Sequence, residues 1–397
     1  MSRKTEMQSL HFAILTENFP PFIGGGIAEW THGVADNLTK RGHNVTVYAK
    51  WKRKVSLTLH QNKSYTVKPM YGRDWGRYRH WLSLYYILKF LRENPDGVII
   101  ATTWDLGTSF GFLKRFFKKA RLVVIAHGKD VTKIKKDRML RQFRRTVEVS
   151  DLVAAVSQFT GNEMLKRLHT NQPNQKIVVI PNGIDVNFYH RTSNHDNLTQ
   201  KLGIARQSRI ILTLARIVER KGHDIVIRSL PKILKEFPET IYLIAGPVQD
   251  QAYHEKIIRL IEELQLRQKV IFVDQVPKED LSKYYSMSDV YVMVSREIPE
   301  TGDSEGFGIT FLEANACECP VIGSDSGGIP DAIEDGKSGF LVPADNEEVL
   351  ADRILTLFRK PDLRTEMGKY GRQRVKQCFT WEQITDRLLK VFFQRHQ

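Results

Sequence analysis

The sequence predicts an α/β protein with two domains, each built on a doubly wound parallel sheet. Short apolar segments rich in Val, Ile and Leu alternate with helix-compatible segments along most of the 397 residues, as expected for strands that are covered on both faces. The length exceeds what one hydrophobic core usually serves and suits two domains. A hydrophobic content of 41% is enough to form both cores.

The first half begins with a βαβ unit. An apolar strand at 12–15 precedes the turn Gly24-Gly25-Gly26, a helical segment that ends near Gly42, and a second strand at 44–48. Glycines in such a turn let backbone N–H groups approach an anion at the start of a helix. The spacing differs from the Gly-x-Gly-x-x-Gly motif of dinucleotide sites. Further strands are expected at 98–101, 122–126, 152–156 and 177–180.

The second half repeats this alternation. Strands are expected at 210–215, 241–245, 270–273, 290–294 and 321–323. The polar stretch 191–200 is the expected linker, so we expect an N-terminal domain at 1–188 and a C-terminal domain at 189–377. The last segment, 378–397, is expected to be a helix that crosses back to the first domain. Its apolar residues recur at helical spacing: Ile384, Leu388, Leu389 and Phe392.

The charge is unevenly distributed. Residues 1–190 carry 31 Lys and Arg against 14 Asp and Glu, whereas residues 191–397 carry 29 against 31. Two segments of the first half, 73–81 and 112–119, also mix cations with aromatic residues. This pattern suits a surface of anionic lipids or a nucleic acid. The alternative is that Trp81, Leu84, Leu88 and Leu91 pack in the core while the charges are solvated.

The compartment is expected to be reducing, because Cys317, Cys319 and Cys378 form neither a metal pattern nor an even disulfide set. The polar start predicts no secretory signal peptide. No apolar run reaches the length of a membrane-spanning helix. We therefore expect a cytoplasmic protein, whose membrane contact, if it occurs, is peripheral on the inner face of the cell membrane.

Candidate binding residues follow the strands, and ligands of open parallel sheets bind outside the carboxyl ends of strands. Arg216 and Lys221 follow the first strand of the second domain, and a guanidinium fork suits a phosphate group. The segment 304–313 follows the strand at 290–294. It contains Glu305 and Glu313, and its glycines, Gly306 and Gly308, let a ligand approach the backbone at the start of a helix.

Over nearly its whole length the chain resembles the retaining glycosyltransferases of GT-B architecture (family 4, group 1 type), which have two Rossmann-like domains. The motifs that carry the resemblance are Gly24-Gly25-Gly26, Arg41-Gly42-His43 with Val45 and Val47, His127-Gly128, Ile180 to Asp185, Arg216 with Lys221, Glu305 with Glu313, Cys319 to Asp331, and Trp381. The long acidic loop 295–304 resembles that of the bacterial phosphatidylinositol mannosyltransferase branch.

The resemblance implies a role for each matching residue. Arg216 and Lys221 would hold the diphosphate of a nucleotide sugar, and Glu313 would bind the ribose hydroxyls. Glu305 and the backbone around Gly306, Phe307 and Gly308 would face the donor sugar, with His127 beside the reacting carbon. The turn that contains Gly25 and Gly26 would cover the diphosphate. For His127, a hydrogen-bonded structural histidine is the alternative.

The implied reaction is transfer of a hexose from GDP-mannose or a UDP-sugar to a hydroxyl group of a lipid-linked or glycan acceptor. We expect no cofactor and no metal, since the sequence has no Asp-x-Asp and Arg216 and Lys221 can supply the charge. Glu305 and Glu313 are eight residues apart, which along a helix is about 12 Å of rise. A retaining glycosidase pair needs about 5 Å. The resemblance implies front-side attack instead, and we expect it because no well-placed nucleophile is visible in the sequence.

Three alternatives compete with this interpretation. A sugar-nucleotide epimerase shares the architecture and needs no acceptor. A nucleic-acid-binding protein could use the same cations, but the sequence contains no recognisable nucleic-acid-binding module, so no nucleic-acid partner is expected. A non-catalytic sugar-nucleotide binder would leave Glu305, Arg216 and His127 without a common role.

Overall fold

The computed structural model describes residues 9–20, 25–51, 63–71, 75–169 and 176–395. The chain folds into two compact units: unit 1 is Met1–Gly183 with Trp381–Gln397, and unit 2 is Ile184–Thr380. The polar stretch 191–200, which we expected to be the linker, lies inside unit 2. There the Ser286 hydroxyl accepts a hydrogen bond from the backbone N–H of Thr192, and the Ser282 hydroxyl donates to the carbonyl of Phe188.

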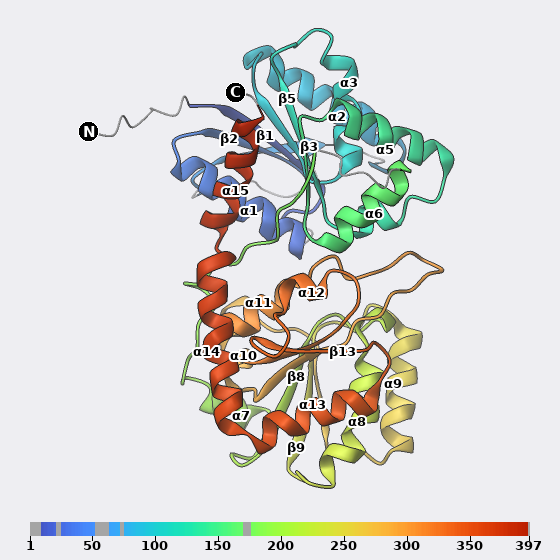
Figure 1. The fold of residues 1–397 in the computed structure, drawn as a ribbon, viewed down its shortest axis with the longest axis vertical. Helices are drawn as coiled ribbons and strands as arrows, with labels where there is room; N and C mark the ends of the chain where they lie inside the picture. Colours follow the sequence, from blue (N-terminus) through green and yellow to red (C-terminus); the bar gives the residue numbers. More distant parts are fainter. Residues whose placement is uncertain (1–8, 21–24, 52–62, 72–74, 170–175, 396–397) are drawn as a thin grey trace, which may run out of the picture. The chain divides into compact units, whose positions relative to one another are not determined.

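Unit 1 contains a seven-stranded sheet in which every neighbouring pair is parallel, in the order β3-β2-β1-β4-β5-β6-β7 (Figure 1). Its strands are β1 (His11–Thr16), β2 (Asn44–Trp51), β3 (Thr66–Tyr71), β4 (Val98–Ala101), β5 (Arg121–Ala126), β6 (Leu152–Ala155) and β7 (Ile177–Val179). Its helices are α1 (Gly26–Lys40), α2 (Trp75–Glu93), η2 (Trp104–Gly107), α3 (Phe110–Leu113), α4 (Lys129–Thr132), α5 (Asp137–Val149), α6 (Gln158–Leu168) and α15 (Trp381–Gln394).

The last helix, α15, packs against α1 within unit 1. The Arg41 guanidinium donates two hydrogen bonds to Asp386 of α15, at 2.6 and 2.8 Å. A Cβ atom on Gly33 would lie 2.1 Å from the Trp381 ring, so α1 needs a glycine where the indole packs. The predicted return of the C-terminal helix to the first domain is therefore confirmed.

Unit 2 contains a six-stranded sheet, also parallel throughout, in the order β10-β9-β8-β11-β12-β13. Its strands are β8 (Arg209–Leu214), β9 (Thr240–Ala245), β10 (Val270–Val273), β11 (Val290–Met293), β12 (Val321–Ser324) and β13 (Gly339–Val342). Its helices are α7 (Asp196–Lys201), η3 (Glu219–Lys221), α8 (His223–Leu234), α9 (Gln251–Glu263), η4 (Lys278–Asp280), α10 (Leu281–Met287), α11 (Ile309–Ala316), α12 (Ile329–Ala332), α13 (Glu347–Arg359) and α14 (Pro361–Cys378).

The fold class predicted from the sequence is confirmed for both units, but two strands were missed. Both are edge strands: β3 ends the sheet of unit 1, and β13 ends that of unit 2. Strand β3 contains Pro69, which cannot donate to a neighbouring strand and is tolerated at an edge. Strand β13 has only four residues and begins with a glycine, so its pattern is weak.

No helix of the described residues combines the length and the apolar character that crossing a membrane requires.

Candidate active site

The candidate site of unit 2 lies where the strand order of its sheet reverses. From β8 the chain proceeds outward through β9 and β10, and from β11 it proceeds through β12 and β13 on the other side. Strands β8 and β11 are therefore neighbours whose following loops separate, and ligands of open α/β sheets bind at such a point. The segment after β8 carries Arg216 and Lys221, and the segment after β11 carries Glu305.

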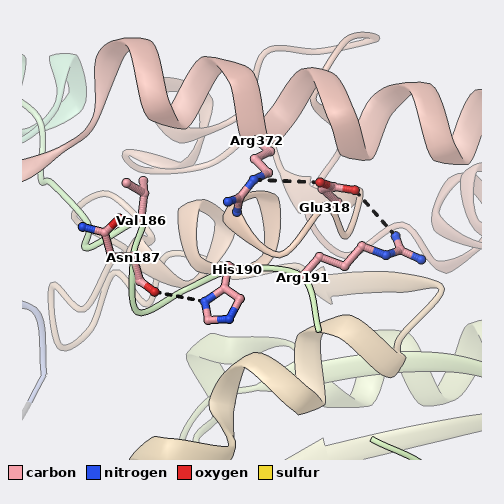
Figure 2. A pocket seen from close by; sticks show the side chains of 6 residues that line it. All are labelled: Val186, Asn187, His190, Arg191, Glu318 and Arg372. Atoms are coloured by element: carbon pink, nitrogen blue, oxygen red, sulfur yellow. Dashed lines mark hydrogen bonds and ion pairs between the residues drawn. The ribbon is translucent and has the colours of Figure 1, made fainter. Parts of the chain in front are cut away.

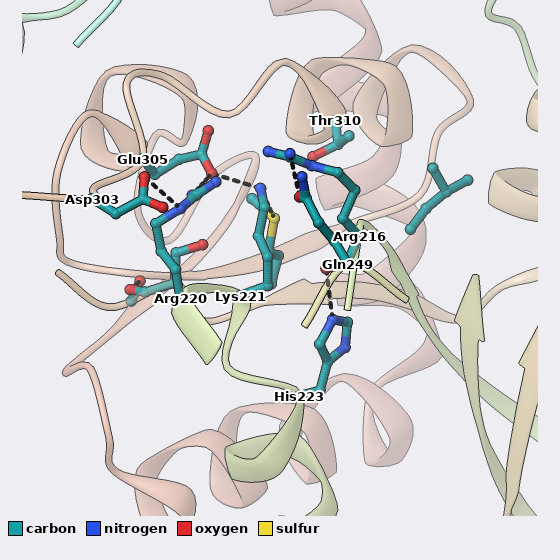
Figure 3. Close-up of polar contacts among 12 residues, drawn as sticks. Arg216, Arg220, Lys221, His223, Gln249, Asp303, Glu305 and Thr310 are labelled. Carbon is teal, nitrogen blue, oxygen red and sulfur yellow. Dashed lines mark hydrogen bonds and ion pairs between the residues drawn. The ribbon is translucent and has the colours of Figure 1, made fainter. Parts of the chain in front are cut away.

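Three side chains meet here within hydrogen-bond distance. The Glu305 carboxylate oxygen Oε2 accepts from the Lys221 ammonium at 2.6 Å and from Nη1 of Arg220 at 2.5 Å (Figure 3). The side chains of Arg220, Lys221 and Glu305 are only 8%, 11% and 15% exposed. Asp303 adds a second carboxylate, whose Oδ1 lies 3.4 Å from Nε of Arg220.

Burial and pairing have opposite effects on the ionisation of these groups. Burial raises the pKa of Glu305, but the charges and hydrogen bonds of Lys221 and Arg220 outweigh burial and lower it to about 2. For Lys221, burial is the largest influence and lowers the pKa, and the attraction of Glu305 offsets only part of this, which leaves a pKa of about 8. At neutral pH the site therefore holds a carboxylate anion and a lysine cation.

Arg216 lies beside this cluster but is exposed and has a neutral partner. Its Nη1 donates to Oε1 of Gln249, which follows β9, at 2.5 Å. Figure 3 shows the guanidinium of Arg216 pointing toward the side of the site where the Lys221 side chain ends. The predicted pair of cations, Arg216 and Lys221, is thus brought together, with only Lys221 bound to a carboxylate.

Backbone contacts hold the Glu305 segment in place. The backbone N–H of Gly328, before α12, donates to the carbonyl of Glu305 at 2.8 Å. Gly327 has φ +57°, and a Cβ atom there would lie 2.5 Å from the same carbonyl oxygen. Gly327 and Gly328 therefore form a close backbone support for Glu305.

Glu313 lies on α11 and is nearly buried. Its Oε2 accepts a hydrogen bond from the Tyr285 hydroxyl at 2.6 Å. The helix begins only at Ile309, after Gly308 with φ +90°, so Glu305 belongs to the loop and not to the helix. Our estimate of a 12 Å helical rise between the two glutamates was therefore wrong in its premise. The two glutamates differ in their partners instead of in their helical spacing: Glu305 binds two cations, and Glu313 binds a tyrosine hydroxyl.

The residues between Glu305 and α11 differ in exposure. Gly306 is partly exposed, whereas the Phe307 side chain is 2% exposed and packs against Phe379, with ring centroids 6.1 Å apart. The Phe307 side chain is therefore part of the hydrophobic packing of unit 2.

The predicted residues of unit 1 lie at the start of α1 and directly after β5. Gly25 has φ +101° and precedes α1, which starts at Gly26, and Gly24 lies outside the described residues. His127 follows β5, and its ring meets that of Trp30 edge-on at 6.1 Å. Burial lowers the pKa of His127 to about 3, so its imidazole is neutral. Its Nε2 is buried and has no hydrogen-bond partner among the described residues.

Four residues of the site, Arg220, Asp303, Gln249 and Tyr285, were not predicted from the sequence. Arg220 stands next to Lys221, but nothing in the local sequence predicted that both would bind one carboxylate. Asp303 belongs to the acidic loop 295–304, which the sequence pattern does single out. Gln249 and Tyr285 lie on other segments, so only the fold brings them to the site.

A separate cavity of about 380 Å³ in unit 2 is lined by Val186, Asn187, His190, Arg191, Glu318 and Arg372 (Figure 2). None of the predicted site residues lines it. Arg372 donates to the carbonyls of Ala316 and Tyr189, and Glu318 lies 3.8 and 3.9 Å from the two arginines. Arg372 therefore caps the carboxyl end of α11, which is a structural role.

Comparison with known families matches both halves of the chain. The family described as glycosyl transferases group 1 matches residues 194–374, and the family described as glycosyltransferase family 4 matches residues 24–188. Together the two matches cover most of the chain, and the protein therefore belongs to the glycosyltransferases of this group, with the GT-B architecture.

Individual relatives agree with this assignment. The chain is 27% identical to the GDP-mannose-dependent alpha-(1-6)-phosphatidylinositol monomannoside mannosyltransferase of Mycolicibacterium smegmatis, over 97% of this chain and 98% of the relative. A glycosyltransferase from Rickettsia africae has the same fold, with a TM-score of 0.82, 20% identity and coverage of 98% and 100%. The Anabaena protein HepE in complex with UDP and glucose has a TM-score of 0.78, 20% identity and coverage of 97% and 100%.

Proposed function

We propose that this glycosyltransferase is a retaining hexosyltransferase, which moves a hexose from a nucleotide sugar to an acceptor hydroxyl. The observation that carries the proposal is the ion pair of Lys221 with Glu305 at the switch point of the unit 2 sheet, with the exposed Arg216 beside it. Two cations suit a diphosphate. The second oxygen of Glu305, Oε1, accepts no hydrogen bond from the described residues and suits a sugar hydroxyl.

GDP-mannose is the first donor to test, because the Mycolicibacterium relative is named as GDP-mannose-dependent. A UDP-sugar is the second, because the Anabaena neighbour was solved with UDP and glucose. A thermal-shift panel of GDP, UDP and ADP sugars separates them: a ligand at one hundred times its Kd adds about 2.7 kcal/mol to the free energy of unfolding. We expect the largest shift with GDP-mannose, and the absence of any shift would contradict the proposal.

The chemistry follows from the charges of the site. The acceptor hydroxyl attacks the anomeric carbon on the face from which the diphosphate departs. The bond from this carbon to the phosphate oxygen breaks, a bond to the acceptor oxygen forms, and the acceptor proton passes to the departing phosphate. Arg216 and Lys221 stabilise the negative charge that develops on the departing phosphate oxygen. We propose that no metal is needed, so activity should be unchanged by EDTA.

Retention and the role of His127 are parts of the same proposal. With a pKa of about 3, His127 is neutral, and its Nε2 can form one hydrogen bond with a sugar hydroxyl, as donor or as acceptor according to the tautomer. It is not expected to act as a cation or as a general acid at neutral pH. Product anomers identified by NMR should keep the configuration of the donor, and trapping of a covalent glycosyl-enzyme would contradict front-side attack.

We propose further that the acceptor is carried by a lipid at an anionic membrane surface. Support comes from an aromatic surface of unit 1, defined by Trp81, Tyr85, Phe112 and Phe116, which are 72%, 58%, 58% and 70% exposed. The exposed cations Arg115, Lys118 and Lys119 accompany it. Of the four residues that the core-packing alternative named, Leu91 is buried and Leu84 and Leu88 pack against the core, whereas Trp81 is exposed. Aromatic rings with cations suit a lipid interface, where each cation contributes about 1 kcal/mol.

Sedimentation with liposomes tests the membrane contact. The protein should sediment with phosphatidylglycerol-containing vesicles more than with phosphatidylcholine vesicles, and the double variant Trp81→Ser/Phe116→Ser should lose most of this binding. Val248→Ser is the matched control, because Val248 is an exposed apolar residue of unit 2. Filter binding to duplex and single-stranded nucleic acid runs beside it, and tighter binding there would overturn the membrane proposal.

A further inference from the structure

We propose that Arg220 and Asp303 form a positioning pair, which orients the Glu305 carboxylate toward the donor sugar and makes Asp303, at the end of the loop 295–304, a support of the sugar-binding end of the site. The inference deepens the proposed function and rests on it. It assigns Arg220 to the carboxylates of the site, and leaves the diphosphate to Arg216 and Lys221.

Arg220 is held by two carboxylates. Its Nη1 donates to Oε2 of Glu305 at 2.5 Å, and its Nε lies 3.4 Å from Oδ1 of Asp303, while the side chain is only 8% exposed. A buried guanidinium is tolerable when its charge is compensated, and here the two anions Glu305 and Asp303 balance the two cations Arg220 and Lys221. Arg220 thus donates a hydrogen bond to one carboxylate and forms an ion pair with the other, whereas the exposed Arg216 donates, among the described residues, only to the neutral Gln249.

A backbone hydrogen bond also joins the loop 295–304 to Arg220. The N–H of Arg296 donates to the carbonyl of Arg220 at 2.9 Å, at the start of the loop. Ile298 and Asp303 then form an antiparallel bridge, in which the N–H of Ile298 donates to the carbonyl of Asp303 at 2.9 Å. This bridge turns the chain back and returns Asp303 to the Arg220 side chain.

A second set of contacts keeps the base of the loop in place. Nη2 of Arg296 lies 2.9 Å from Oδ1 of Asp224, at the start of α8, and its Nε lies 2.8 Å from Oδ1 of Asp345. The Tyr253 hydroxyl donates to the same Asp224 oxygen at 2.6 Å. Since α8 directly follows η3, the loop and the segment that carries Arg220 and Lys221 share one support.

As a result, the two oxygens of the Glu305 carboxylate have different environments. Lys221 and Arg220 both bind Oε2, and Oε1 accepts no hydrogen bond from the described residues. Two donors on one oxygen fix the rotation of the carboxylate, so its free oxygen points in one direction. A sugar hydroxyl that donates to this oxygen would lose its partner if Arg220 released Glu305, whereas the diphosphate would keep Arg216 and Lys221.

Calorimetric binding of GDP and GDP-mannose to the full chain tests this division, with UDP and UDP-glucose as the second pair. The variants are Arg220→Met, Asp303→Asn and their combination, and Glu297→Gln is the control, an exposed carboxylate of the same loop. Arg220→Met should lower the affinity for the sugar nucleotide about tenfold and the affinity for GDP or UDP less than twofold. Asp303→Asn alone should weaken the sugar nucleotide about threefold, and Glu297→Gln should change neither.

The double variant gives the sharpest result. In the Arg220→Met protein the Asp303 carboxylate loses this cation and repels Glu305, so adding Asp303→Asn should restore part of the lost sugar-nucleotide affinity. Additive losses would overturn the pairing, and equal losses for GDP and GDP-mannose would place Arg220 on the diphosphate. A wild-type protein that binds GDP and GDP-mannose equally, with the same equality for the UDP pair, would overturn the orientation of Glu305 toward the sugar.

Two further outcomes separate this inference from the proposed function. If the wild-type protein binds none of the four nucleotides, the donor site itself is wrong and the inference falls with it. If Arg220→Met fails to fold by circular dichroism, Arg220→Lys takes its place: it keeps the charge but cannot span two carboxylates, and should still weaken the sugar nucleotide selectively.

Discussion

The Nζ atom of Lys221 lies 2.6 Å from Oε2 of Glu305, across 84 positions of the sequence, and both side chains are largely buried. The pair joins the segments that follow β8 and β11, which separate at the switch point of the sheet. Each group keeps its charge because the other is present. The function of the site should therefore respond to pH through this pair.

The alkaline side of the pH profile should report Lys221. Its pKa of about 8 lies below the usual 10.5, so the charge that attracts the diphosphate is lost as the pH rises through about 8. We expect kcat/KM for the donor to fall above this pH. Glu305→Gln removes the attraction that raises this pKa, while Arg220 and Arg216 continue to lower it, so the decline should move to lower pH. An unchanged midpoint in Glu305→Gln would contradict the assignment.

Glu305 should also contribute to stability in acid. Its pKa is about 2 in the folded protein against an ordinary 4.5, so its stabilising contribution is complete above about pH 4.5 and is lost as the pH falls through about 2. Urea unfolding between pH 3 and pH 6 should show a steeper loss of stability for the wild type than for Glu305→Gln. At pH 7 this variant should be less stable by about 3 kcal/mol, because Lys221 is left buried without its anion and Arg220 keeps only Asp303.

Arg216 and Lys221 should each matter for turnover. Removing one donor to the developing phosphate charge costs about 10² to 10³ in kcat, which is the loss we expect for Arg216→Ala and for Lys221→Ala. Gln249 offers a graded test. Gln249→Glu gives Arg216 an anionic partner that competes with the diphosphate, so it should lower donor affinity more than Gln249→Ala, and the difference should shrink at high salt. Normal turnover of Arg216→Ala would refute the role.

Glu313 should recognise the ribose. One of its oxygens is bound by the Tyr285 hydroxyl, and we expect the carboxylate to accept hydrogen bonds from the ribose hydroxyls. Wild-type protein should bind GDP more tightly than 2′,3′-dideoxy-GDP by about tenfold, and Glu313→Gln should lose most of this preference. Tyr285→Phe leaves the carboxylate but removes this donor, so it should lower the affinity for both ligands less than Glu313→Gln does. If Glu313→Gln kept the wild-type preference for GDP over 2′,3′-dideoxy-GDP, a contact between Glu313 and the ribose would be excluded.

Gly327 should be sensitive to the smallest side chain. Its φ of +57° disfavours other residues, and a Cβ atom would lie 2.5 Å from the Glu305 carbonyl oxygen. We expect Gly327→Ala to cost about 1 to 3 kcal/mol in the free energy of unfolding and to weaken donor binding, because the Glu305 segment must shift. Gly336→Ala is the control: its φ is also positive, at +74°, but nothing lies within 4 Å of the added Cβ. Similar donor affinity in the two variants would contradict a support role for Gly327.

Much of the fold was predictable because it is encoded locally. The buried strands of both units are short runs of Val, Ile and Leu, and their alternation with helices predicts parallel sheets. The two missed strands, β3 and β13, lie at sheet edges, where Pro69 and Gly339 are tolerated and the apolar pattern weakens.

The candidate site was predictable only in part. Arg216, Lys221 and Glu305 stand in motifs that resemble a known family, and each follows an identifiable strand. Nothing in the local pattern predicts that Arg220 would bind Glu305, that Asp303 would return to Arg220, or that Gln249 would engage Arg216.

By itself the sequence determined the class of this protein: two doubly wound α/β domains, with the strand ends that carry the cations and the glutamates of a glycosyltransferase. The tertiary structure alone decided the charge arrangement of the site. Lys221 and Arg220 share one oxygen of Glu305 because β8 and β11 are neighbours in the sheet although they lie far apart in the sequence. Hydrophobic periodicity is a local property, whereas an ion pair depends on which segments the sheet order brings together.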